Sequence, residues 1–265
     1  MRFAIGFAVF FAFTGALLAQ GPAFQEPELH VHKLSIISAD LPASERKQII
    51  HAFAGSTYSS DELQERIRQQ LRDTGYFDPS VEMRKLEFVS TKEPVYKADL
   101  KFTVRAGEKY HVGEIIFEGA KTFPPEHLRS LFPASGTLFN ATAIGKSLEN
   151  LKELYGTAGY INFGAIPKPM LDSGRHVVDL TIAVDQGAAF TFGTLLFEGV
   201  EPRAGIANDL LASWNLNGKR YNPQSLNNWL KGNTSSWPPE WRHQIRSDSV
   251  QDPERRVANV LLHFQ

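Results

Sequence analysis

Two stretches of the chain repeat one pattern. Residues 99–120 read DLKFTVRAGEKYHVGEIIFEGA, and residues 179–200 read DLTIAVDQGAAFTFGTLLFEGV, aligned without a gap. Identical glycines stand at Gly113 and Gly193, and both stretches close on Phe-Glu-Gly before a small residue. Self-similarity at a fixed spacing is the sequence signature of repeated structural units. The spacing therefore predicts units of about 80 residues.

A second pattern, a glycine followed three residues later by an aromatic residue and then by a helix cap, occurs three times. It spans Gly55–Ser59, Gly136–Asn140 and Gly218–Asn222. The last residue of each stretch is a favoured N-cap, because its side-chain oxygen accepts hydrogen bonds from N–H groups of the first helical turn. The aromatic residue before it is placed to pack on an apolar residue one turn into the helix. Each copy therefore predicts the start of a helix.

The segments that follow have the apolar period of a helix. Leu63, Ile67 and Leu71 recur every four residues in the first copy. The first two helices are expected to stop at Gly75 and Gly159, each followed by tyrosine. Glycine adopts the left-handed conformation that ends many helices, and the residue after it packs back on the last turn.

The repeats predict an α+β fold made of three tandem β-α-α-β-β modules. Each module is expected to be a three-stranded mixed sheet with two helices on one face, a two-layer arrangement that buries one core. The modules are expected at residues 28–107, 110–187 and 190–265. The third is divergent, because Trp237-Pro-Pro-Glu-Trp241 replaces the Gly-Tyr helix stop.

The composition excludes several classes of protein. The 265 residues contain 28 Lys plus Arg and 29 Asp plus Glu, a net charge of −1, which lacks the cation surplus of a general nucleic-acid binder. The chain has no cysteine. This excludes a disulfide scaffold, a thiolate nucleophile, a cysteine-ligated metal site and a lipid anchor on cysteine.

The first residues have the features of a secretory signal. Phe3–Leu18 is an apolar run preceded by one charge, and a small residue, Ala19, stands at the end of the segment. The run is shorter than the roughly 20 residues of a membrane-spanning helix. We therefore expect residues 1–19 to be a signal peptide and the protein to be exported. The alternative is an uncleaved N-terminal membrane anchor.

A module of this size and order resembles the polypeptide-transport-associated (POTRA) domain. The resemblance rests on the G-x-[IL]-[IL]-F-E-G strand, the G-x-x-[FY] helix start, and the L-x-x-x-Y-x-x-x-G-Y helix end at Leu151–Tyr160. POTRA domains form periplasmic arrays in front of the β-barrels of BamA- and TamA-type outer-membrane protein assembly factors. The resemblance implies a periplasmic docking array, associated with the outer membrane, without the β-barrel. The implied partners are unfolded outer-membrane client proteins or subunits of the β-barrel assembly machinery, and no nucleic acid.

Motifs of enzyme active sites do not occur in the sequence. The G-x-S-x-G, P-loop and H-E-x-x-H patterns are all missing. His30 and His32 alternate on the first expected strand and could share a metal, but no third ligand is fixed by spacing, so surface histidines are the favoured interpretation. We expect no catalytic residues, no cofactor and no metal site.

Modules that resemble POTRA domains have their second strand at a sheet edge, where backbone groups are free to pair with another chain. In the second module, Pro167 and Pro169 remove N–H groups from one side of this strand, which predicts that addition of a further strand is blocked there. The strand expected at 80–89 of the first module has no proline. Its apolar residues change phase at Arg84-Lys85, which predicts a β-bulge. The candidate partner-binding residues are those of this edge strand: Val81, Met83, Arg84, Leu86 and Phe88.

Two functions are consistent with the sequence. The favoured one is a non-enzymatic periplasmic scaffold that binds clients or assembly subunits by β-strand addition, in which backbone hydrogen bonds supply the affinity. The alternative is a membrane-anchored structural protein of the divisome type, in which a POTRA-like module recruits one defined partner. An intact N-terminus in purified membranes favours the alternative.

Overall fold

A computed structural model describes residues 28–90, 96–198, 204–234 and 245–264. The chain forms two compact units. Of the described residues, those up to 114 form one unit together with 133–144 and 169–180, and 115–132, 145–168 and the described residues from 181 on form the other. The predicted signal peptide and the segment Trp237–Trp241 lie outside the described residues. Within the described ranges, no helix is both long enough and apolar enough to cross a membrane.

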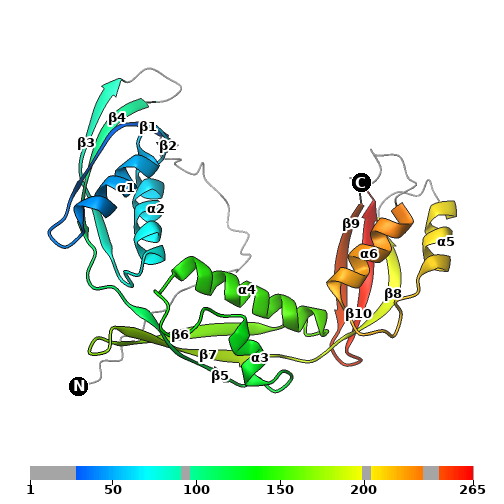
Figure 1. The fold of residues 1–265 in the computed structure, drawn as a ribbon. Helices are drawn as coiled ribbons and strands as arrows, with labels where there is room; N and C mark the ends of the chain where they lie inside the picture. Colours follow the sequence, from blue (N-terminus) through cyan, green and yellow to red (C-terminus); the bar gives the residue numbers. More distant parts are fainter. Residues whose placement is uncertain (1–27, 91–95, 199–203, 235–244, 265) are drawn as a thin grey trace. The chain divides into compact units, whose positions relative to one another are not determined.

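The predicted order β-α-α-β-β occurs three times and produces three separate sheets (Figure 1). The first sheet has the order β2-β1-β4-β3, the second β5-β7-β6 and the third β8-β10-β9. The elements of the first repeat are β1 (Leu29–Ile37), α1 (Ala43–Phe53), β2 (Thr57–Tyr58), α2 (Ser60–Asp73), β3 (Ser80–Ser90) and β4 (Tyr96–Arg105). Those of the second are β5 (His111–Glu118), α3 (Pro125–Ser130), α4 (Ala141–Thr157), β6 (Gly164–Asp172) and β7 (Val177–Asp185). Those of the third are β8 (Thr191–Glu198), α5 (Ala204–Ser213), α6 (Pro223–Thr234), β9 (Ile245–Asp252) and β10 (Val257–Phe264).

The first sheet is mixed, as predicted, but has four strands rather than three. Strands β1 and β4 run parallel, and β3 is antiparallel to β4. The additional strand, β2, is two residues long and pairs antiparallel with the start of β1, where Tyr58 lies opposite Leu29. The two residues of β2, Thr57 and Tyr58, belong to the segment between the helices, so the aromatic residue of the helix-start pattern also extends the sheet.

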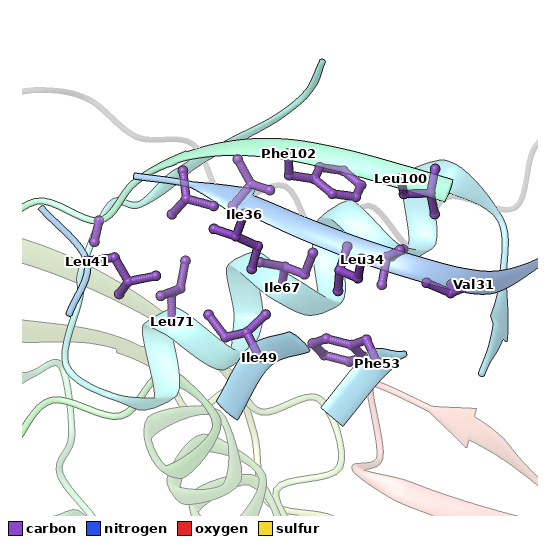
Figure 2. Packing of buried hydrophobic residues seen from close by; sticks show 14 of the residues in the cluster. Val31, Leu34, Ile36, Leu41, Ile49, Phe53, Ile67, Leu71, Leu100 and Phe102 are labelled. Carbon is purple, nitrogen blue, oxygen red and sulfur yellow. The ribbon is translucent and has the colours of Figure 1, made fainter. Parts of the chain in front are cut away.

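Helices α1 and α2 cover one face of the first sheet and enclose its core (Figures 1 and 2). The buried side chains of α2 are Leu63, Ile67 and Leu71, the three residues whose spacing predicted the helix. They pack in one cluster with residues of β1 and β4, among them Leu34 and Phe102. A buried Leu or Phe side chain contributes roughly 1.5–3 kcal/mol by leaving water. This face of the sheet is therefore fixed as the interior.

At each predicted helix start, the side chain of the N-cap residue accepts a hydrogen bond from the first turn of the helix. The Ser59 Oγ accepts from the Glu62 N–H (3.2 Å), Asn140 Oδ1 from the Ala143 N–H (2.7 Å), and Asn222 Oδ1 from the Gln224 N–H (2.8 Å). All three predicted N-caps are confirmed.

Both predicted glycine stops are also confirmed. Gly75 and Gly159 have φ of 101° and 90°. In each case the following tyrosine donates its N–H to a carbonyl of the last turn, Tyr76 to Leu71 (3.2 Å) and Tyr160 to Tyr155 (3.0 Å). This is the six-to-one bond of a Schellman motif.

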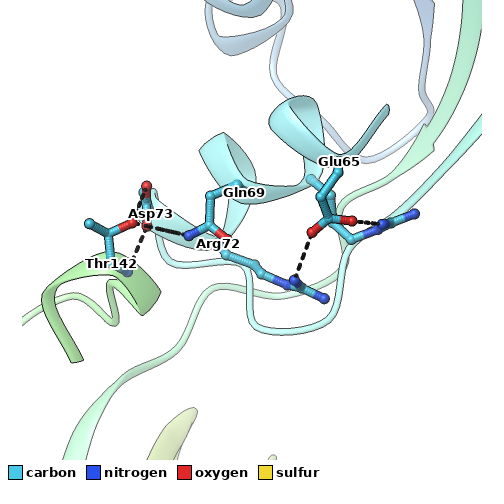
Figure 3. A network of polar contacts seen from close by, with 6 residues as sticks. Glu65, Gln69, Arg72, Asp73 and Thr142 are labelled. Carbon is cyan, nitrogen blue, oxygen red and sulfur yellow. Dashed lines mark hydrogen bonds and ion pairs between the residues drawn. The ribbon is translucent and has the colours of Figure 1, made fainter. Parts of the chain in front are cut away.

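A polar network ties the end of α2 to the start of α4 inside the first compact unit (Figure 3). Asp73 accepts from the Thr142 N–H and from the Thr142 hydroxyl, each at 3.0 Å. The Gln69 side-chain amide donates to both Asp73 and Thr142 at 3.1 Å. The Asn140 side chain donates to the backbone carbonyl of Asp73 (2.9 Å). An acidic side chain from one helix thus supplements the N-cap of another.

Candidate partner-binding edge

Strand β3, which contains the candidate partner-binding residues, lies at one edge of the first sheet. It pairs antiparallel with β4 from Ser80, opposite Arg105, to Ser90, opposite Lys97. Among the described residues it has no second neighbouring strand in the sheet order. The backbone groups that point away from β4 are therefore available to an added strand. The predicted position at a sheet edge is confirmed.

The predicted β-bulge is also confirmed. The register between β3 and β4 shifts between Met83 and Lys85, so Arg84 is the extra residue. The shift puts the apolar residues before and after it on the same face. Val81, Met83, Leu86 and Phe88 lie opposite Val104, Phe102, Leu100 and Ala98, which are all buried in the core. The extra residue of the bulge therefore keeps the apolar side chains on one face, although their alternation changes phase in the sequence.

This apolar row becomes more exposed toward its middle and far end. Val81 is 2% exposed, whereas Met83 is 39% and Phe88 is 50% exposed. Leu86 packs against the core at partial burial. The Phe88 ring makes an edge contact with Tyr96, with ring centroids 5.9 Å apart. Uncovered apolar side chains thus lie beside free backbone groups, which is the combination that strand addition uses.

Arg84 is separated from the other four predicted residues. Its guanidinium donates to the Thr103 hydroxyl (3.1 Å) and lies 3.5 Å from the Glu82 carboxylate. Thr103 lies opposite Glu82 and belongs to the face that the helices do not cover. Because Arg84 is the bulged residue, it turns to this outer face. The structure brings four of the five predicted residues together and places the fifth on the other side of the strand.

Comparison with known proteins agrees with this fold. The family model of POTRA, described as surface antigen variable number repeat, matches residues 30–107 and 110–187, more than half of the chain. The chain belongs to the POTRA family. The solved structure of Haemophilus influenzae BamA POTRA3-5 is similar, with a TM-score of 0.64 and 16% identity, over 94% of this chain and 100% of that one. The three POTRA domains of Omp85 from Anabaena give a TM-score of 0.38 and 15% identity over 91% and 96% of the two chains, a likeness too low to carry an argument.

The other two sheets of this POTRA chain end in edges of different character. Strand β6 is an edge and carries Pro167 and Pro169, as the sequence predicted. Strand β9 is the edge of the third sheet and pairs with β10 from Ile245 to Asp252 without a register shift.

The β9 edge was missed by the sequence reasoning, although the lack of proline in Ile245–Gln251 could have indicated it. Its residues opposite the buried Leu262 and Val260 are Ser247 and Ser249, which are polar. An added strand would find an unbroken backbone edge there but no apolar row. Strand β3 is therefore the better candidate for an apolar client.

One of the two histidines of β1, His32, makes a structural contact. The His32 Nδ1 lies 2.8 Å from the Asp99 carboxylate on the neighbouring strand β4. In the described part of the chain, no three His, Cys, Asp or Glu side chains are grouped to hold a metal ion.

Tyr76, which follows the end of α2, ionises less readily than an ordinary tyrosine, because its pKa is raised. Burial and a hydrogen bond with Glu45 raise the pKa of Tyr76 to about 12. Lys109 lies over the same ring and pairs with Glu45 at 2.9 Å. The contacts among Tyr76, Glu45 and Lys109 join the end of α2 to α1 and to the segment after β4. The raised pKa of Tyr76 is therefore explained by packing within the first module.

Proposed function

We propose that the chain is a non-enzymatic periplasmic scaffold in outer-membrane protein assembly or secretion. It binds client polypeptides, or subunits of the assembly machinery, as an extended strand added to β3. The observation that carries the proposal is the combination on one strand of an unpaired sheet edge with the exposed apolar residues Met83 and Phe88. Backbone hydrogen bonds supply affinity with little demand on the client sequence, and the apolar row favours apolar alternate residues in the client. Membership of the POTRA family supports this reading.

The first step of the test identifies what binds. A variant with a photo-crosslinking residue in place of Phe88 is expressed in cells, and the proteins crosslinked to it are identified by mass spectrometry. Outer-membrane proteins or assembly subunits are the expected products. Crosslinks to no protein of either class would contradict the proposal.

The second step uses a matched pair of proline variants. N–H groups of successive residues in a strand point to opposite sides, so one of Glu82→Pro and Met83→Pro removes an outward N–H and the other an inward one. Both positions precede the bulge. The inward variant breaks a bond to β4 and lowers the melting temperature. The outward variant retains the melting temperature and loses the Phe88 crosslinks.

Two results would contradict strand addition at β3. One is crosslinking from position 88 that survives in the outward variant, and the other is client crosslinking from a photo-crosslinking residue placed in β6 but not from position 88. Replacement of Met83 by Gln serves as a control for the loss of its side chain alone. It retains every backbone N–H and is expected to weaken crosslinking without abolishing it.

A further inference from the structure

The outer face of the first sheet, opposite α1 and α2, has a surplus of positive charge. Alternation along β1 and β4 places polar side chains there, because their neighbours in these two strands are buried, and the residues of β3 that lie opposite them share the face. The exposed cationic side chains of this face are Lys33, Arg84, Lys85, Lys97, Lys101 and Arg105, and its carboxylates are Glu82, Glu87 and Asp99. The whole chain, by contrast, has a net charge of −1. Cations are thus concentrated on one side of this sheet.

The carboxylates of the face are already engaged. Glu82 faces Arg84 at 3.5 Å, Glu87 pairs with Lys85, and Asp99 faces His32 at 2.8 Å. No carboxylate of the described residues forms an ion pair with Lys33, Lys97 or Lys101. The face therefore presents uncompensated positive charge to solvent.

Three of the lysines surround one shallow hollow. Lys33, Ser35, Lys85 and Lys101 line it together with Glu87, Asp99 and Leu100, so the lysines outnumber the carboxylates by three to two. Lys101 and Lys85 are directly opposite each other in the β3–β4 pair, and Ser35 lies opposite Lys101 on the other side. Like charges directly opposite in a sheet are destabilising. Glu87 already offsets the charge of Lys85, and an anionic group above the hollow would offset the charges of Lys33 and Lys101 and accept hydrogen bonds from them and from Ser35.

We propose that this basic outer face docks on a bilayer surface that carries anionic lipid headgroups. The cations are distributed over three neighbouring strands rather than along one, which suits a surface of headgroups better than a single extended acidic chain. The exposed Ile37 (48%) stands at one end of this face, opposite Thr103, and the exposed Val89 (53%) is the extra residue of a second register shift near the other end of the β3–β4 pair. Side chains of this kind at the margin of a basic surface suit the boundary between headgroups and acyl chains. The inference goes beyond the proposed function, because it concerns a face of the sheet and not its edge.

Vesicle co-sedimentation tests the proposal. The purified protein is mixed with vesicles of phosphatidylcholine alone, or of two parts phosphatidylcholine to one part phosphatidylglycerol. Binding is expected with the anionic vesicles alone and should weaken as salt is added, because exposed charges are screened. The double variant Lys33→Gln/Lys101→Gln is expected to bind about thirtyfold more weakly, since each lysine near an anionic surface contributes about fivefold.

A matched control separates the face from total charge. Lys47→Gln/Lys146→Gln removes the same charge from exposed positions on α1 and α4 and is expected to bind like the parent. Equal loss in both double variants, equal binding to neutral vesicles, or no binding to anionic vesicles would overturn the proposal. Binding of poly-glutamate without binding of anionic vesicles would also overturn it, in favour of an acidic polypeptide. Crosslinking from the Phe88 position in the Lys33→Gln/Lys101→Gln variant tests the β3 edge separately, so the two proposals fail independently.

Discussion

The carboxylate of Asp179 occupies the space that a side chain on Gly113 would fill. A Cβ on Gly113 would lie 2.0 Å from the Asp179 Oδ1, which accepts the Glu114 N–H at 2.7 Å. The same relationship recurs in the third sheet, where a Cβ on Gly193 would lie 2.1 Å from Asn259 Oδ1. The repeated glycine thus makes room for a side-chain oxygen of the neighbouring strand. That oxygen binds the backbone next to the glycine.

We expect Gly113→Ala to destabilise the protein by about 1–3 kcal/mol, the range for inserting a methyl group into a filled site. The free energy of unfolding in urea measures the effect. Gly145→Ala is the control, because that glycine lies in α4 with no atom within 4 Å of its Cβ position. The control should stabilise by up to about 1 kcal/mol, since alanine favours a helix interior over glycine. Equal stability of the two variants would contradict the steric explanation.

The network at Asp73 leads to a second prediction. Asp73→Ala removes two acceptor contacts from Thr142 at the start of α4 and should cost about 1 kcal/mol, the usual value of an N-cap. Thr142→Val is expected to cost less, because it removes the hydroxyl and leaves the backbone N–H bonded to Asp73. Glu149→Ala, at an exposed position on α4, is the matched control. A double variant at Asp73 and Thr142 that costs the full sum of the single changes would show that the two side chains do not act together.

The stability of the first sheet should depend on pH through Asp40. Burial opposes ionisation of this carboxyl group, but hydrogen bonds from the Gly107 N–H (2.8 Å) and the Ser38 hydroxyl (2.7 Å) outweigh it and lower the pKa of Asp40 below 3.8. A lowered pKa stabilises the folded state at pH values above the unfolded pKa, and this contribution disappears as pH falls through the folded pKa. Asp40→Asn should therefore be less stable than the parent at about pH 7, and the difference should shrink at about pH 3.

Urea unfolding at several pH values measures this difference. Ser38→Ala removes one of the donors to Asp40 and is expected to show a smaller gap of the same sign. A gap between Asp40→Asn and the parent that stays constant, or grows, toward acid pH would contradict the assignment.

The sequence predicted the features that depend on local residue types. The N-caps at Ser59, Asn140 and Asn222, the glycine stops at Gly75 and Gly159, and the order of strands and helices are set within a few residues of chain. The bulge in β3 was also predictable, because a change of apolar phase has to be absorbed while one face stays buried. The edge position of β3 came from the family resemblance.

Features that join distant residues could not be predicted in this way. The repeats show that Gly113 and Gly193 are shared, but only the fold reveals the oxygens of Asp179 and Asn259 beside them. Likewise, nothing near Asp73 in the sequence indicates a bond with Thr142. The charge surplus on the outer face is invisible in a chain with a net charge of −1, because only folding gathers more cations than carboxylates on that face.

The aromatic residue of the helix-start pattern supplies the last prediction, which separates a structural role from partner contact. Phe139 is 6% exposed and packs against the Phe77 ring at 5.2 Å, so Phe139→Ala should cost about 3–5 kcal/mol, the range for truncating a buried aromatic side chain. Tyr58 occupies the equivalent position but is only partly buried, and Tyr58→Ala should cost less. Phe139→Leu preserves most of the volume and is expected to recover much of the loss. Thermal melting and Phe88 crosslinking are measured on the same samples. A Phe139→Ala variant that melts like the parent and loses its crosslinks would show that this residue binds the partner rather than holding the module together.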